Sequence, residues 1–140
     1  MDSVHFNDDH RLLRDQIERF IKNEVAPCAD QWELDGKVPR ETLRKLGELG
    51  LLGVRVPEKY GGSGMNAIAS VAMAETLARC TYGGFTVTVA VHTDMASPHL
   101  VNAGSEAQCE RYLPGIVSGD TITSIAVTEP DAGSDVQGLR

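Results

Sequence analysis

The sequence lacks the features that several classes of protein require. Aromatic residues make up only 5% of the 140 residues, so a buried core has to be built mainly from Leu, Ile, Val, Ala and Met. Lys and Arg number 13 against 20 Asp and Glu, which disfavours a nucleic-acid groove because such grooves cluster basic side chains. No apolar run approaches the roughly 18 residues of a membrane span. We therefore expect neither nucleic acid nor a membrane span among the interactions of this chain.

Cysteine is also scarce. Cys28, Cys80 and Cys109 lie far apart and form no Cys-x-x-Cys pair, so we expect reduced thiols that behave as small hydrophobic residues. The first residues are neither basic nor followed by an apolar segment, so no secretory leader is expected. Together these two absences predict a cytoplasmic location.

What remains is the composition of a globular protein, with 41% hydrophobic and 24% charged residues. Apolar residues recur at helical spacing in several stretches. These stretches predict helices over residues 10–25, 39–49, 66–79 and 105–116, with a short helical or turn segment at 30–35. The segment 66–79 is made almost wholly of small apolar residues, which predicts that most of its circumference is buried.

Local sequence signals at the ends of these segments support their assignment as helices. Asn7 is a good N-cap for the first helix, and Ser105-x-x-Gln108 has the form of a capping box for the last. Three glycines between residues 61 and 64 predict a loop that needs unusual backbone angles or close approach.

Two segments rich in β-branched residues carry a β signal. Residues 85–92 alternate like a strand, but we expect a buried helix there because tertiary context overrides propensity. Residues 121–127 are predicted to be the one genuine strand. A single strand cannot satisfy its own backbone groups, so a chain that stops at Arg140 is expected to continue. The sequence thus predicts a mainly α protein, with a helical domain over 1–120 and the start of a β domain over 121–140.

The stretch after this strand is where chemistry is most readily placed. The strand delivers the hydroxyl of Thr128 into a tight turn, and a small-residue loop with a second hydroxyl, Ser134, follows. Such a loop suits close backbone approach to a phosphate or to the edge of a planar ring. The residues alone equally allow an ordinary strand-to-loop turn, with Glu129 and Asp135 solvated.

Other combinations of reactive residues form no recognisable site. His92 and His99 are seven residues apart, which on one helix separates them by about 10 Å along the axis. That separation is too large for two ligands of one metal ion, and Pro98 is expected to break the helix between them. No metal site and no Ser-His-Asp arrangement is predicted.

The segment from Val127 to Asp135, VTEPDAGSD, resembles the signature motif of acyl-CoA dehydrogenases almost residue for residue. Several blocks upstream resemble the N-terminal helical domain of the same family, and they occur in the family's order. They are residues 49–57 (LGLLGVRVP), 58–64 (EKYGGSG), 104–108 (GSEAQ) and 112–114 (YLP), followed by Gly119. The resemblance covers nearly the whole chain.

This resemblance implies a fold and a reaction. The family has an α-helical N-terminal domain, a middle β-barrel domain and a C-terminal helical bundle, so this chain would hold the first domain and the opening strand of the second. Members remove a proton from the α-carbon of an acyl-CoA thioester and pass a hydride from the β-carbon to FAD. The product is the 2,3-enoyl-CoA of fatty-acid β-oxidation, and the electrons usually pass to an electron-transfer flavoprotein. Members are homotetramers or dimers.

The resemblance also implies the site residues. The flavin would be contacted by Ile125, Ala126, Val127, Thr128, Gly133 and Ser134. Thr128 would donate hydrogen bonds to the pyrimidine edge of the isoalloxazine ring, where donors stabilise negative charge on the reduced ring. Ser134 would also lie near the thioester-bearing arm of the substrate. The remaining substrate contacts, in the wall of the acyl pocket, would be Ala90, Val91 and Met95.

The sequence departs from the family's usual motif at two positions. Ile125 replaces an aromatic residue found in some relatives and favours the longer-chain branch, and Asp131 replaces a frequent glycine. The family's catalytic base is a glutamate expected downstream of Arg140, so no catalytic residue is predicted here and the 140 residues alone are expected to be inactive. Glu129 belongs to the loop and is not expected to transfer protons.

Two alternatives remain open at this point. One is an acyl-CoA oxidase of the same superfamily, which shares the loop but hands electrons to oxygen. The other is a non-catalytic helical module that binds acyl-CoA or a protein partner.

Overall fold

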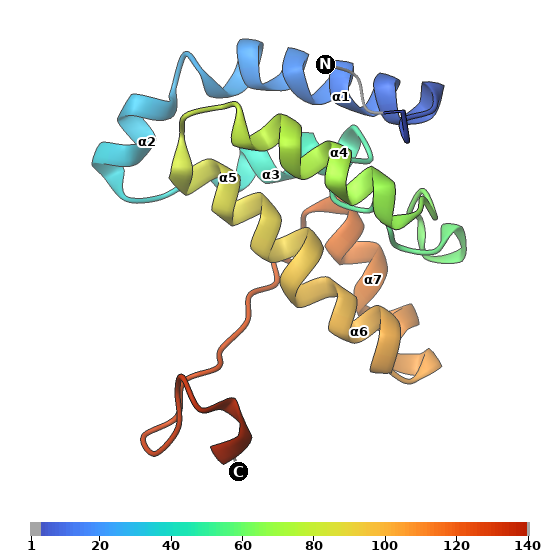
Figure 1. The fold of residues 1–140 in the computed structure, drawn as a ribbon, viewed down its shortest axis with the longest axis vertical. Helices are drawn as coiled ribbons and strands as arrows, with labels where there is room; N and C mark the ends of the chain where they lie inside the picture. The colour runs from blue at the N-terminus through green and yellow to red at the C-terminus, as the bar shows by residue number, and fades with distance from the viewer. Residues whose placement is uncertain (1–3, 140) are drawn as a thin grey trace.

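A computed structural model describes residues 4–139, which form a body of helices and a C-terminal arm that projects away from it (Figure 1). The α-helices are α1 (Asp8–Phe20), α2 (Ala29–Asp35), α3 (Arg40–Glu48), α4 (Ala67–Ala78), α5 (Gly83–Ala90), α6 (Ser97–Ala103) and α7 (Glu106–Ser118). Short turns of other helical types are η1 (Ile21–Val25), η2 (Glu58–Tyr60), η3 (Val91–Ala96) and η4 (Val136–Gly138). The mainly α fold predicted from the sequence is confirmed.

Residues 83–103 form one continuous helical rod. α5 runs without a break into the π-helical turn η3 and then into α6. The helical expectation for residues 85–92 is therefore correct, although their β-branched side chains favour a strand. The expectation that Pro98 breaks the helix is wrong, because the wide π turn before it makes room for the proline ring. Pro98 lies at the first turn of α6, where its missing N–H costs no hydrogen bond.

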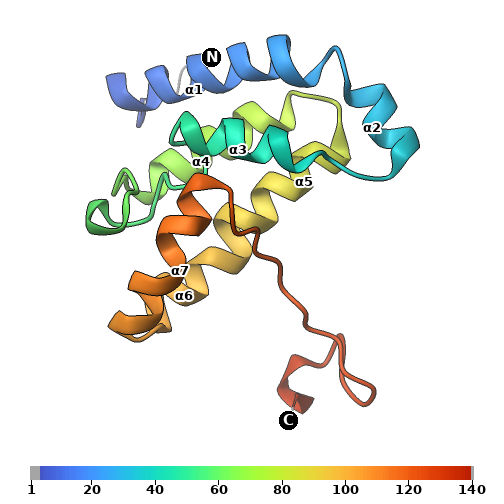
Figure 2. The same cartoon turned by 180° about the vertical axis from the view of Figure 1, so that it is seen from behind.

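The helices pack around two hydrophobic clusters. α1 lies along α4, and α7 packs against both α3 and α6 (Figures 1 and 2). The main cluster joins α1, α3, α4 and α5, and its aromatic centre is Phe85, whose ring centroid lies 6.4 Å from Phe20 and 6.5 Å from Trp32. The second cluster joins α7 to the loop after α3 and to η2. It consists of Val56, Tyr60, Cys109, Leu113, Ile116 and Val117.

The caps predicted from the sequence are formed. The Asn7 side chain accepts from the backbone N–H of His10, and Ser105 and Gln108 form a reciprocal capping box at α7. His10 also links the cap of α1 to the cap of α4. Its Nε2 lies 3.2 Å from Oδ1 of Asn66, which is the N-cap residue of α4. Since α1 and α4 start side by side, one hydrogen-bonded group fixes both helix origins.

The structure corrects two expectations about burial and strand structure. α4 buries only one side, and its other side exposes small apolar residues such as Val71, which is 54% exposed. Residues 121–127 are extended but pair with no other strand, so the predicted strand is not formed among residues 4–139. A strand needs a neighbour to receive its backbone hydrogen bonds, and the helices around the start of the arm offer none.

The cysteines and the glycine loop behave largely as expected. Cys80 and Cys109 are buried among apolar side chains, whereas Cys28 is exposed. In the glycine loop, Gly61 and Gly64 have positive φ angles of 89° and 58°. No helix within residues 4–139 combines the length and apolar character needed to cross a membrane.

Candidate functional site

The predicted cofactor segment forms a tight turn on the arm. Residues 129–132 close this turn, because the N–H of Glu129 donates to the carbonyl of Ala132 at 2.7 Å and the reverse bond measures 3.3 Å. Gly133 faces Thr128, since a Cβ built on the glycine would lie 3.6 Å from the Thr128 methyl group. The turn thus brings together Thr128 and Gly133, two of the residues predicted to contact the flavin.

This turn presents hydrogen-bond donors beside exposed apolar side chains. The hydroxyls of Thr128 and Ser134 are exposed, and Ile125 and Val127 retain 39% and 38% of their surface on the same strand-like segment. An isoalloxazine ring has acceptors along its pyrimidine edge and an apolar face, so hydroxyl and backbone donors next to aliphatic side chains suit it. The residues present therefore fit a flavin.

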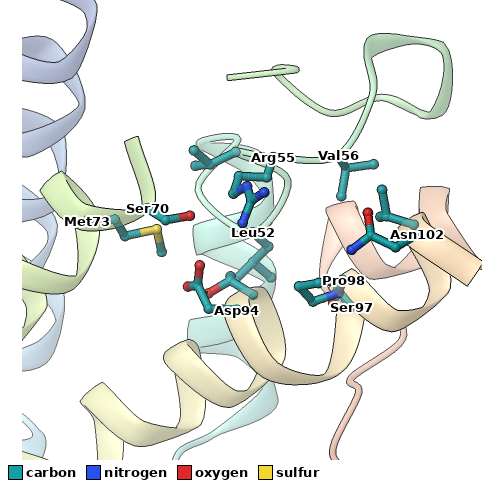
Figure 3. A pocket seen from close by; sticks show the side chains of 12 residues that line it. Leu52, Arg55, Val56, Ser70, Met73, Asp94, Ser97, Pro98 and Asn102 are labelled. Carbon is teal, nitrogen blue, oxygen red and sulfur yellow. The ribbon is translucent and has the colours of Figure 1, made fainter. Parts of the chain in front are cut away.

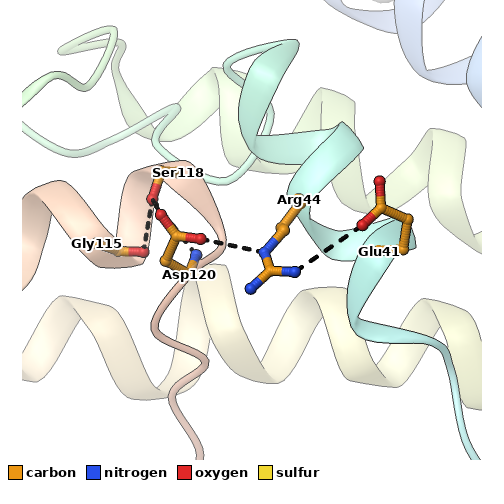
Figure 4. Close-up of polar contacts among 5 residues, drawn as sticks. All are labelled: Glu41, Arg44, Gly115, Ser118 and Asp120. Carbon is orange, nitrogen blue, oxygen red and sulfur yellow. Dashed lines mark hydrogen bonds and ion pairs between the residues drawn. The ribbon is translucent and has the colours of Figure 1, made fainter.

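The arm starts at a close contact between α3 and α7. A Cβ on Gly47 would lie 2.2 Å from the carbonyl oxygen of Ser118, so only glycine lets the end of α7 approach α3 so closely. Asp120 then forms an ion pair with Arg44, whose Nε lies 3.1 Å from Asp120 Oδ1 (Figure 4). The Ser118 hydroxyl, 3.0 Å from Asp120 Oδ2, and Arg44 hold the pKa of Asp120 below its ordinary value.

A second attachment holds the arm three residues further on. The backbone N–H of Thr123 donates to Nδ1 of His92 at 3.1 Å, and the Thr123 hydroxyl lies 3.0 Å from the same nitrogen. The hydroxyl of Ser97 bonds the carbonyl of His92 and lies 3.2 Å from the Thr123 hydroxyl. On its other side, His92 Nε2 lies 3.1 Å from the carbonyl oxygen of Ile116 in α7. His92 thus connects the rod, α7 and the arm.

The predicted substrate residues lie on the rod beside this attachment. Ala90 and Val91 are half-buried and immediately precede His92, and Met95 is 49% exposed one turn later. Val87 continues the same apolar stripe toward the start of α5 and is also exposed. The structure presents these residues as an outward-facing stripe, and their role as an acyl-pocket wall stays a prediction.

An open cleft of the helical body lies elsewhere on the rod. It lies between α4, the loop after α3, η3 and α6. Figure 3 shows Arg55 and Asp94 in this cleft together with the apolar side chains of Leu52 and Met73. None of the residues predicted to bind cofactor or substrate lines it.

The structure does not support a metal site formed by His92 and His99. Both ring nitrogens of His92 are engaged within the fold, and His99 is exposed further along α6. Among residues 4–139, no group of three or more His, Cys, Asp or Glu is arranged to hold an ion.

Sequence reasoning missed the His92–Thr123 connection. Considered by its spacing, His92 is one half of a histidine pair, whereas its real partners are main-chain atoms far away in sequence. The available signal was a histidine that directly follows the segment containing Val87, Val89 and Val91, because an imidazole buried with such a segment requires hydrogen-bond partners.

Comparison with known proteins agrees with this architecture. Residues 7–120 match the family model described as "Acyl-CoA dehydrogenase, N-terminal domain". The chain belongs to the acyl-CoA dehydrogenase family. The mitochondrial long-chain specific acyl-CoA dehydrogenase of Rattus norvegicus is 38% identical to this chain over 137 residues, which are 96% of this chain and 31% of that protein.

Solved structures of acyl-CoA dehydrogenases share the fold. The enzyme of Geobacillus kaustophilus superposes with a TM-score of 0.90 at 35% identity, over 99% of this chain and 36% of the other. The Bacillus anthracis acyl-CoA dehydrogenase complexed with FAD gives a TM-score of 0.87 at 37% identity, over 99% and 24%. The chain therefore spans only about a quarter to a third of the length of these relatives.

Proposed function

We propose that this chain is the N-terminal part of a flavoenzyme that oxidises saturated acyl-CoA thioesters to 2,3-enoyl-CoA. The observation that supports it is the segment over residues 125–134, which presents two hydroxyls and exposed aliphatic side chains on the arm that leaves a helical body of the matching family (Figure 1). In this proposal residues 1–120 are the helical domain and residues 121–140 begin the middle β domain.

The proposal gives each part of this chain a role. FAD, when bound, would accept the hydride from the substrate β-carbon. The hydroxyl and N–H of Thr128 would donate to the pyrimidine edge of the ring, with Ile125, Ala126 and Val127 along its face. Gly133 would allow close approach, and Ser134 would lie between the cofactor pyrophosphate and the substrate.

The substrate would lie along the rod. Ala90, Val91 and Met95 would form one wall of the acyl pocket, and their small or flexible side chains suit a long chain. The base that removes the α-proton is assigned to the remainder of the full-length protein. We further propose that the electrons pass to an electron-transfer flavoprotein, that the full-length protein is a homotetramer or dimer, and that it is located in the cytoplasm.

The first test is a visible spectrum of the full-length protein with octanoyl-CoA or palmitoyl-CoA added under anaerobic conditions. We expect a bound-flavin band that bleaches with at least one of them, and stronger bleaching by palmitoyl-CoA would support the longer-chain assignment. A colourless protein that takes up no added FAD would contradict the proposal and favour a helical binding module. Rapid reoxidation of the reduced flavin by air, with release of hydrogen peroxide, would indicate an oxidase.

The role of Thr128 has a test of its own. Thr128→Val removes the hydroxyl donor but keeps the backbone N–H, and it preserves side-chain volume. Removing one hydrogen-bond donor to a developing negative charge typically lowers a reaction rate by on the order of 10²–10³. Because Thr128→Val leaves the backbone N–H in place, we expect it to lower the rate of flavin reduction by only about 10-fold. The rate of flavin bleaching measures this, with Thr86→Val, on α5 away from the arm, as the matched control.

A further inference from the structure

His92 has no role in the proposed chemistry, yet it is the most completely engaged polar side chain of the rod. Its side chain is fully buried, at 0% exposure, although both of its neighbours in sequence, Val91 and Thr93, are only half-buried. Placing an imidazole there carries a desolvation cost that an aliphatic side chain of similar volume would avoid. The structure offsets this cost with hydrogen bonds from two other segments of the chain.

The partners of His92 fix its tautomer. The backbone N–H of Thr123 can only donate, so Nδ1 must be the unprotonated nitrogen. The carbonyl of Ile116 can only accept, so Nε2 must carry the proton. Both partners are main-chain groups, and together they require the neutral Nε2–H imidazole. Burial acts in the same direction by lowering the pKa of His92.

This hydrogen bond fixes the register of the arm. Thr123 lies two residues before Ile125 and five before Thr128, in an extended segment that advances about 3.3 Å per residue. A bond to the backbone N–H of Thr123 specifies which residue of the arm faces the rod, because sliding by one residue would present a different amide. On the rod, the neighbour of His92 is Val91, a predicted substrate contact.

We infer that His92 is a positioning residue that sets the flavin-binding segment in register with the acyl-binding helix. This inference rests on the proposed function. Through the bond from Thr123, the ring holds the segment that carries Thr128 at a defined distance from the stripe that carries Val91. Hydride transfer needs the ring and the substrate β-carbon within contact distance, so this register is a condition for the reaction.

The experiment uses the full-length protein and compares three variants at a temperature where each is folded. His92→Leu keeps an apolar side chain of similar size but removes both bonds, His92→Gln keeps an acceptor and a donor, and His99→Leu makes the same exchange at an exposed site of the rod. The readouts are the FAD dissociation constant of the apoprotein, the shape of the bound-flavin absorption band and the apoprotein Tm.

We expect His92→Leu to weaken FAD binding by roughly 10- to 100-fold, the range for leaving buried hydrogen-bond partners unpaired, and to change the flavin band. His92→Gln should recover most of the affinity, and His99→Leu should match the wild type. Wild-type affinity and an unchanged band in folded His92→Leu would overturn the inference while leaving the flavoenzyme assignment intact. A wild-type protein that binds no FAD would overturn both.

A variant on the arm guards against failure of His92→Leu to fold. Thr123→Val removes the hydroxyl that contacts His92 and Ser97, and it lies outside the two hydrophobic clusters. We expect FAD to bind roughly 3- to 10-fold more weakly, because the backbone bond remains. If His92→Leu is unfolded and Thr123→Val binds FAD as the wild type does, the inference is overturned.

Discussion

Buried imidazole groups can make folding sensitive to pH, and His92 is such a group. Its ordinary pKa of 6.5 applies in the unfolded state, whereas burial lowers the pKa in the folded state and the carbonyl of Ile116 only partly opposes this. As the pH falls below 6.5, the unfolded chain therefore binds a proton that the folded chain does not. The stability contributed by neutral His92 is fully present above this pH and is lost as the pH falls through the folded-state pKa.

The predicted effect is a stability slope of up to about 1.4 kcal/mol per pH unit from this one group. Urea unfolding of the wild type and of His92→Gln at pH 7.5, 6.5 and 5.5 measures it. The slope should be shallower in His92→Gln and unchanged in His99→Gln. Equal slopes in wild type and His92→Gln would show that His92 titrates normally. The lowered pKa of Asp120 does not interfere, because its ordinary value of 3.8 lies far below this window.

Single residues were predictable where their role is local. Asn7, Ser105 and Gln108 cap helices through neighbours three positions away, and such bonds follow from sequence spacing. The role of His92 depends on main-chain atoms 24 and 31 positions away, which no local pattern encodes.

The seam between α3 and α7 shows how one element constrains another. Alanine favours helix over glycine by about 1 kcal/mol, but a Cβ at Gly47 would meet the carbonyl of Ser118 at 2.2 Å. Two backbones would have to separate, so we expect Gly47→Ala to lower the free energy of unfolding by about 1–3 kcal/mol. Gly83, at the first turn of α5, has no atom within 4 Å of a built Cβ. Gly83→Ala, measured by the same urea titration, should be neutral or stabilising, and equal losses in both variants would contradict the account.

The shared cap of α1 and α4 leads to a second prediction at this scale. Asn66 accepts from the N–H groups of Ile68 and Ala69, and its Oδ1 also faces His10. Asn66→Ala should cost about 1–2 kcal/mol, toward the upper part of the range for N-cap loss, because the neighbouring helix loses a partner too. Thermal unfolding by circular dichroism would measure it. Asn23→Ala, at an exposed site in η1, is the matched control and should change Tm little.

Helices with mixed composition were easier to predict than helices made of one kind of residue. α1 alternates apolar and charged residues, and the pattern predicts the burial of Leu13, Ile17 and Phe20. It was wrong at Leu12, which is 62% exposed, and at Arg14, which is buried. α4 is made mostly of small apolar residues, so its sequence gives little indication of which side meets the core. The prediction that most of its circumference is buried was wrong. For α5, propensity favoured a strand, and the surrounding helical fold decided the outcome.

At the scale of the whole molecule, the helical body and the arm differ in what holds them. The helices bury two clusters, whereas residues 124–128 are exposed and extended. We expect amides in this part of the arm to exchange with solvent hydrogen in seconds in the 140-residue chain. In the full-length protein, pairing with the next strands should slow this exchange on the order of 100-fold. Mass spectrometry of exchanged peptides measures both, with α7 as the internal reference, and protection in the short chain would contradict the prediction.

The arm also shows why the sequence predicted the chemical groups of the candidate site but not their position relative to the helices. The motif over residues 127–135 identifies donors and glycine in order, and the structure brings Thr128 and Gly133 together. The position of the arm relative to the rod depends on Gly47, Asp120 and His92 together, which are scattered through the chain.

The π turn η3 has a consequence for how this rod tolerates changes in length. A π turn contains one residue more than the α turn it replaces, and in this rod it lies within the residues Val91–Ala96. Deleting one of them would leave a regular α-helix of nearly unchanged phase, because only the extra residue is removed. Pro98 would then lie inside a regular helix, where its ring meets the carbonyl four residues earlier. The loss of one residue from this stretch would therefore act through Pro98, while the direction of α6 would change little.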